Sequence, residues 1–188
     1  ACTQNKAWQD ALQPDLRIAV NFSARQFQQF NLVKMVANCL EKTGLEAKYL
    51  ELEITESTAM QDVEYTRKIL SELQNMGVQI ALDDFGTGYC SLNYLRKFPL
   101  NILKIDKSFV SELTTGPCER AITNAVATLG RDLNLSVVAE GVETKEQLEC
   151  LRELHCQEIQ GYYFSRPLSA NDASKLLVDS LLRKVKIA

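Results

Sequence analysis

The stretch Ile80-Ala-Leu-Asp-Asp-Phe-Gly-Thr-Gly-Tyr-Cys-Ser-Leu92 joins an apolar run to two adjacent carboxylates and a glycine loop. The apolar run from Val78 to Leu82 is long enough for a buried strand. Asp83 and Asp84 follow it directly, and neighbouring side chains at a strand end point to different sides. We therefore expect the pair to reach two hard divalent cations, or one Asp to bridge them while the other binds singly. An ordinary turn explains the same residues, so the interpretation depends on how the other strands end.

Five further segments show strand patterns, and helical spacing separates them. The predicted strands cover residues 16–20, 49–56, 78–82, 101–106, 136–140 and 159–164. The predicted helices cover residues 1–13, 27–40, 62–76, 91–98, 121–133, 144–154 and 169–181, with a polar loop at 111–117. Strands that alternate with helices through short loops indicate a parallel α/β sheet. This pattern fits a (β/α) barrel or a doubly wound open sheet, and periodicity does not separate the two.

Composition indicates one globular domain over residues 1–188. The chain is 46% hydrophobic and 24% charged, and its net charge of -3 gives no basic surplus for duplex nucleic acid. No apolar run approaches the roughly 18 residues of a membrane-spanning helix, and no signal peptide opens the chain. The six cysteines form no Cys-x-x-Cys pair, so we interpret them as reduced thiols of a cytoplasmic protein. His155 is the only histidine, and we assign it no chemistry.

Polar or charged residues stand at the carboxyl end of every predicted strand, where parallel α/β folds place their active sites. They are Asn21, Glu53 with Glu56, Asp83 with Asp84, Lys104, Glu140 with Glu143, and Gln160. Carboxylates with an amide and no histidine or thiolate favour Mg²⁺ or Mn²⁺ over zinc or copper. Two such metals with a bridging Asp can activate a water for displacement at phosphorus, and a lysine beside them neutralises charge. The set predicts phosphoester hydrolysis. The chain has no P-loop motif, so nucleoside triphosphate binding of the P-loop type is not supported.

Six motifs in chain order resemble the EAL domain, a family of bacterial phosphodiesterases that open cyclic di-GMP to linear pGpG. They are Asn21-Phe-Ser, Glu53-Ile-Thr-Glu56, Asp83-Asp-Phe-Gly-Thr-Gly-Tyr89, Leu103-Lys-Ile-Asp106, Ala139-Glu-Gly-Val-Glu143 and Gln160-Gly-Tyr-Tyr-Phe-Ser165. The resemblance runs from Ala1 to about Leu177. It implies a TIM-like (β/α)₈ barrel with one strand reversed, of which about six of the eight strands are present here.

The resemblance also implies a two-metal site for Mg²⁺ or Mn²⁺. Asn21, Glu53 and Asp83 would hold the first metal. Asp83, Asp84 and Glu140 would hold the second, with Asp83 as the bridging ligand.

Other roles follow from the same resemblance. Lys104 would position the nucleophilic water, with Glu143 and Gln160 supporting the water and the substrate side of the site. Gln160 and Pro167 would contact the substrate, cyclic di-GMP. Glu56 would anchor the loop after Asp84, through which the family couples dimerisation to activity, so we expect a homodimer.

One family motif is missing from the sequence. The Glu-Ala-Leu strand and a phosphate-contacting arginine belong upstream of Ala1 in the family pattern, so we expect a domain without its N-terminal strands. Such a chain should hydrolyse cyclic di-GMP weakly or not at all, although its parent protein can carry further domains and a membrane anchor. The alternative is a degenerate, non-catalytic EAL module that binds cyclic di-GMP or a protein partner. A sugar-phosphate type of barrel enzyme does not explain the glycine loop.

Overall fold

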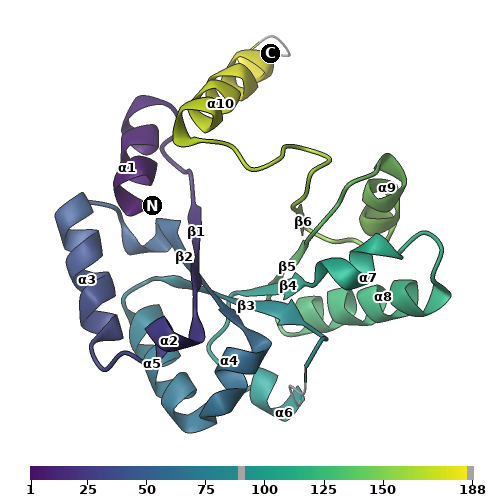
Figure 1. The fold of residues 1–188 in the computed structure, drawn as a ribbon, viewed down its shortest axis with the longest axis horizontal. Coiled ribbons are helices and arrows are strands. Elements are labelled where there is room, and N and C mark those ends of the chain that lie inside the picture. Colours follow the sequence, from purple (N-terminus) through teal and green to yellow (C-terminus); the bar gives the residue numbers. More distant parts are fainter. Residues whose placement is uncertain (89–91, 186–188) are drawn as a thin grey trace.

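The computed structural model describes residues 1–88 and 92–185. Within these residues, six strands form one parallel sheet in the order β1-β2-β3-β4-β5-β6 (Figure 1). The strands are β1 (Ile18–Phe22), β2 (Leu50–Thr55), β3 (Gln79–Phe85), β4 (Ile102–Ile105), β5 (Ser136–Ala139) and β6 (Glu158–Ile159). The strand order follows the chain without the reversal that a doubly wound sheet requires. The sheet is therefore a half-barrel, which confirms the α/β barrel class.

Helices follow the strands around the outside of this sheet (Figure 1). They are α1 (Cys2–Ala11), α2 (Ala24–Phe27), α3 (Leu32–Thr43), α4 (Glu56–Gln61), α5 (Val63–Asn75), α6 (Leu92–Leu95), α7 (Lys107–Ser111), α8 (Pro117–Asp132), α9 (Lys145–Glu153) and α10 (Ala170–Val185), with a 3₁₀ turn η1 (Ala47–Tyr49). Several ends match the sequence signals. Gly44 ends α3 with a φ of 67°, and Thr144 with Gln147 forms a capping box where the helix predicted from residue 144 begins. In the described part of the chain, no helix has the length and apolar character to cross a membrane.

Three helix boundaries differ from the predictions. The helix expected from residue 27 is split, because the chain turns after α2 and leaves Phe30 fully exposed before α3 begins. The loop predicted at 111–117 is present over residues 112–116, but the helix start predicted at Ala121 is wrong. Pro117 opens α8, where the missing proline N–H costs nothing. Strand 49–56 ends one residue early, because Thr55 accepts a hydrogen bond from Thr58 N and caps α4. The predictions for Tyr89, Cys90 and the start of the 91–98 helix lie outside the described residues.

The strand predicted over residues 159–164 is also wrong. The β6 strand ends at Ile159, and Phe164 N donates to Gly161 O to close a turn. Gly161 lies directly against the backbone of Val142, and a Cβ on Gly161 would lie 2.1 Å from Val142 O. The glycine thus allows the chain to fold back over the segment that follows β5.

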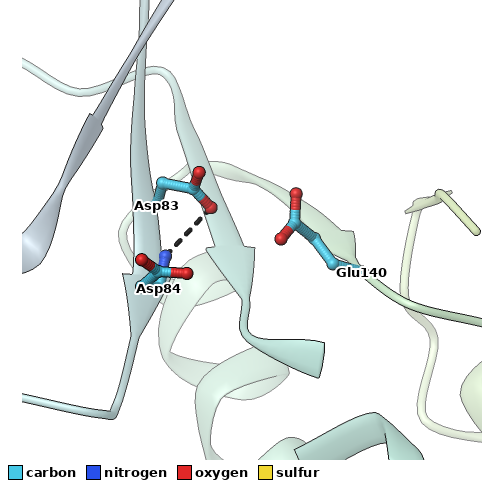
Figure 2. Close-up of side chains that lie close together, drawn as sticks. All are labelled: Asp83, Asp84 and Glu140. Atoms are coloured by element: carbon cyan, nitrogen blue, oxygen red, sulfur yellow. Dashed lines mark hydrogen bonds between the residues drawn. The ribbon is translucent and has the colours of Figure 1, made fainter. Parts of the chain in front are cut away.

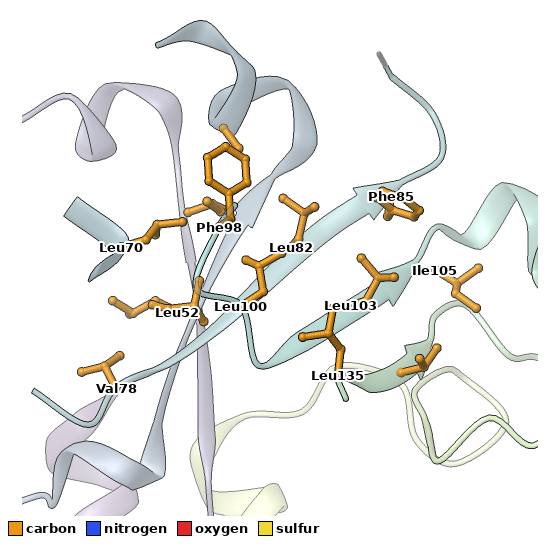
Figure 3. Close-up of a cluster of buried hydrophobic side chains, with 14 of the residues drawn as sticks. Leu52, Leu70, Val78, Leu82, Phe85, Phe98, Leu100, Leu103, Ile105 and Leu135 are labelled. Carbon is orange, nitrogen blue, oxygen red and sulfur yellow. The ribbon is translucent and has the colours of Figure 1, made fainter. Parts of the chain in front are cut away.

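The two faces of the sheet differ in chemistry. The outer face packs against the helices and forms the main core, with Leu52, Leu82 and Leu103 each at most 3% exposed (Figure 3). On the inner face, Ala81, Ile102 and Val138 form a small apolar cluster. Complete TIM barrels usually fill this space with branched apolar side chains. Here charged side chains occupy it, and the strand register brings them together.

Candidate metal centre and active site

Asp83 and Asp84 sit on an irregular end of β3. The pairing of β3 with β4 shifts in register between Leu82 and Phe85, as at a β-bulge. Asp84 has a φ of 55°, a left-handed conformation that is uncommon for any residue with a Cβ. Its backbone N donates to Asp83 Oδ1 over 2.9 Å. The two Asp residues therefore stay close together, unlike those at a regular strand end, and the expectation that they bind two cations or that one bridges stays a prediction.

Glu140 faces the Asp pair from the end of β5 (Figure 2). One carboxylate oxygen from each of Asp83, Asp84 and Glu140 lies within 4.8 Å of the others. Carboxylate oxygens are the ligands that Mg²⁺ and Mn²⁺ prefer, so this donor set fits the implied metals. The bulge and the parallel register thus create one oxygen-rich point from residues that are distant in sequence.

Lys104 lies at the centre of this charged group. Its side chain is 3% exposed, and its Nζ lies 2.6 Å from Glu53 Oε1, 2.5 Å from Glu140 Oε1 and 3.5 Å from Asp83 Oδ1. Burial disfavours the ammonium, but hydrogen bonds to Glu140 and Glu53 and the charge of Asp83 outweigh it, so the pKa of Lys104 lies above its ordinary value. A buried lysine is stable here because three carboxylates compensate its charge.

The carboxylates of this group repel each other. Burial, followed by the charges of Asp83 and Asp106, raises the pKa of Asp84. Burial also raises the pKa of Glu140, although Lys104 opposes the shift. A divalent cation would relieve this repulsion, and perturbed pKa values cluster at functional sites.

Asp106 is a residue that the sequence predictions missed. Its carboxyl group is in hydrogen-bond contact with that of Asp84, and it also caps α7 by accepting from Ser108 N. Burial raises its pKa, but the hydrogen bonds from Ser108 and the contact with Asp84 lower it more. The sequence signal that could have identified Asp106 is its position two residues after Lys104, at the carboxyl end of the same strand.

Glu56 holds the glycine loop. Its side chain is 2% exposed, and its Oε2 accepts a hydrogen bond from Gly86 N over 3.0 Å. A Cβ on Gly88 would lie 2.5 Å from Glu56 Oε1, so the loop needs glycine there. The contact that a loop anchor requires is present, and its effect on activity stays a prediction.

The remaining predicted residues lie around this centre. Asn21 is exposed on β1 and pairs in register with Glu53, and in residues 1–88 and 92–185 no hydrogen bond joins it to the carboxylates. Glu143 and Gln160 line a cavity of about 230 Å³ together with Glu140. Gln160 also lines a second cavity, of about 520 Å³, with Pro167. Asn21, Glu143 and Gln160 thus lie at or just after the carboxyl ends of β1, β5 and β6, in separate positions, and Pro167 lies in the segment before α10.

The sequence pattern of the EAL domain family matches residues 1–167. This chain belongs to the EAL domain family. It is 49% identical over 170 residues to the bifunctional diguanylate cyclase/cyclic di-GMP phosphodiesterase MucR of Pseudomonas aeruginosa, covering 90% of this chain and 25% of MucR. It is 45% identical over 168 residues to the cyclic di-GMP phosphodiesterase NbdA of the same organism, covering 89% of this chain and 22% of NbdA. The chain therefore spans about a quarter of the length of these relatives.

Solved structures of EAL proteins have the same fold. The MucR phosphodiesterase in complex with cyclic di-GMP superposes with a TM-score of 0.89 at 48% identity, covering 92% of this chain and 70% of that chain. BlrP1 of Klebsiella pneumoniae, in complex with manganese and cyclic di-GMP, superposes with a TM-score of 0.80 at 29% identity, covering 88% of this chain and 42% of that chain.

Proposed function

We propose that this chain carries the metal and water side of a phosphodiesterase site that hydrolyses cyclic di-GMP to linear pGpG. The observation that carries the proposal is the group of Asp83, Asp84 and Glu140 oxygens within 4.8 Å of one another, next to buried Lys104. The family membership and the cyclic di-GMP complexes of MucR and BlrP1 support the same substrate.

Two divalent metals fit the donor set. Asn21, Glu53 and Asp83 would hold the first, and Asp83, Asp84 and Glu140 the second, with Asp83 shared. Asp106 adds an oxygen beside Asp84. Mg²⁺ or Mn²⁺ bound there supplies an activated water and compensates charge on phosphate oxygens.

Lys104 has a separate task. Its ammonium is held between strands β2 and β5 by Glu53 and Glu140. From this position Lys104 would hold the attacking water and neutralise charge in the transition state, and a bound cation would weaken the competing attraction of the carboxylates. Glu143 would support that water, and Gln160 and Pro167 would contact the dinucleotide from the cavities that they line.

Two properties of the family are part of the proposal. We propose a homodimer that forms through the loop after Asp84, which Glu56 holds in place by its contact with Gly86. We also propose that the domain works in the bacterial cytoplasm, where cyclic di-GMP would be its partner and duplex nucleic acid would not.

The test is a hydrolysis assay with cyclic di-GMP and Mg²⁺ or Mn²⁺ on a domain completed with the Glu-Ala-Leu strand, because the chain alone should be weak or inactive. Lys104→Ala should lower kcat far more than it changes KM, because the lysine acts on the water and the transition state. Lys68→Ala, on the exposed face of α5, is the matched control and should keep the parental rate. A Lys104→Ala variant that forms pGpG at the parental rate would remove Lys104 from the mechanism. Binding of cyclic di-GMP by the completed domain without any pGpG would instead support the non-catalytic module.

A further inference from the structure

Two cysteines meet where α1 packs against α3. Cys2 begins α1 and is 7% exposed, whereas Cys39 on α3 is exposed to solvent. Both thiols are free, and the Cys39 side chain is in hydrogen-bond contact with the thiol of Cys2. An accessible thiol therefore touches a buried one, although the two are far apart in sequence.

The two sulfurs also share a cavity of about 220 Å³ with almost entirely apolar walls. Val20 and Phe22 of strand β1 line the same cavity, as do Leu50 and Leu52 of β2. The cavity gives the two side chains room to adjust, which matters because a disulfide requires a restricted geometry.

The other described cysteines lack this combination. Cys118 on α8 is exposed, but within residues 1–88 and 92–185 it has no contact with a second thiol. Cys150 is buried, and burial raises the pKa of Cys156 to about 11, which keeps that thiol protonated and unreactive.

We propose that Cys2 and Cys39 form a reversible disulfide when the protein meets a small-molecule disulfide. The thiolate of Cys39 attacks one sulfur of the reagent and releases one equivalent of reduced thiol. Cys2 then loses its proton to solvent and attacks the Cys39 sulfur of the mixed disulfide, which releases the second equivalent. The two protein thiols are oxidised and the reagent is reduced to two thiols, and excess thiol reverses both steps.

The disulfide would tie α1 to α3 across the edge of the half-barrel. Both helices meet above β1, the strand that carries Asn21. The bond closes a loop from residue 2 to residue 39 and restricts the unfolded chain, so oxidation should raise the urea midpoint of unfolding. This effect does not depend on phosphodiesterase activity.

The test is incubation of the full 188-residue chain with oxidised glutathione, followed by thiol titration and mass spectrometry of peptides. The parental chain should lose two free thiols, those of Cys2 and Cys39. The peptide that contains Cys2 should be linked to the peptide that contains Cys39, with no glutathione attached. Cys118→Ser is the matched control and should lose the same two thiols.

Two variants separate the steps. Cys2→Ser should accumulate glutathione on Cys39, because no second thiol resolves the mixed disulfide. Cys39→Ser should leave Cys2 reduced, because Cys2 is buried. The proposal is overturned if the parental chain keeps glutathione on Cys39 with Cys2 free, or if Cys39 links two chains into a dimer.

Discussion

The half-barrel carries one ion group at each end of its strands. At the carboxyl ends, Lys104 pairs with Glu53 and Glu140 at 2.6 and 2.5 Å. At the amino ends, Arg17 before β1 makes two hydrogen bonds to Glu158 of β6, at 2.8 and 2.9 Å. The distances are alike, but the Lys104 side chain is 3% exposed and both partners of the Arg17 pair are 42% exposed.

This difference in exposure decides what each group can do. Charges in water attract weakly and are screened by salt, so the Arg17–Glu158 pair adds little stability while it joins the two edge strands. Charges out of water interact strongly, and the loss of one partner leaves the others uncompensated. The two groups have similar distances, but their different exposure predicts unequal interaction energies. Substitutions in both groups test that prediction.

Lys104→Met should have the largest effect. Without metal, it leaves Glu53, Asp83 and Glu140 buried together without a cation, which should lower the free energy of unfolding by about 3–5 kcal/mol. Urea titration by circular dichroism measures this. Added Mn²⁺ should recover part of the loss, and the exposed control Lys68→Met should change stability by less than about 0.5 kcal/mol. A loss below about 1 kcal/mol for Lys104→Met would show that burial does not strengthen this group.

Asp84→Asn should separate metal binding from stability. It removes a metal ligand, so calorimetry should show Mn²⁺ binding weakened by about tenfold or more, whereas Asp132→Asn on the exposed end of α8 should bind as the parent. Mn²⁺ affinity of the parent should also fall as the pH drops, because protons compete for Asp84 and Glu140, and their raised pKa values start this loss above the ordinary carboxylate range.

The same substitution has an opposite effect on the metal-free fold. Because the pKa of Asp84 is raised on folding, its contribution to stability is present at low pH and is lost as the pH rises through the folded value. Metal-free Asp84→Asn should therefore be more stable than the parent at neutral pH, and this gain should disappear in acid. A variant that loses stability at neutral pH would contradict the repulsion inferred at this site.

Glu56→Gln should have an intermediate effect. The substitution keeps the shape of the side chain but replaces a charge-assisted hydrogen bond to Gly86 N with a neutral one. The expected loss is about 1 kcal/mol in the free energy of unfolding. Glu72→Gln, exposed on α5, is the control. A loss equal to that of the control would show that the charge of Glu56 is not needed to hold the loop.

Arg17→Gln should have the smallest effect, below about 1 kcal/mol. The double variant with Glu158→Gln isolates the pair energy in a mutant cycle, and that energy should shrink as salt is added. A pair energy of several kcal/mol, insensitive to salt, would remove the contrast between the two ends of the sheet.

Much of this fold could be predicted because its signals are local. Apolar runs marked the strands, and the capping box at Thr144 marked a helix start that the structure confirms. The convergence of Asp83, Lys104 and Glu140 followed from parallel topology, since such strands end at one edge.

The rest depends on contacts between distant segments. The bulge at Asp83 and Asp84 arises from the pairing of β3 with β4, which no run of residues within β3 encodes. The fold-back at Gly161 depends on the backbone of Val142, so its Tyr-Tyr-Phe run looked like a strand. The position of Asp106, two residues after Lys104, could have marked it as a site residue in the sequence. Its contact with Asp84, however, is visible only in three dimensions.

The contact between the first and last helices makes a spectroscopic probe. Trp8 is the only tryptophan of the chain, and its Nε1 donates to Ser174 Oγ of α10 over 2.7 Å. Indole emission shifts to longer wavelength when water reaches the ring, so intrinsic fluorescence reports whether α10 is docked on α1. Local opening of one helix can precede global unfolding. If the fluorescence transition comes at lower urea than the circular dichroism transition, α10 detaches while the sheet and its carboxylates are still folded.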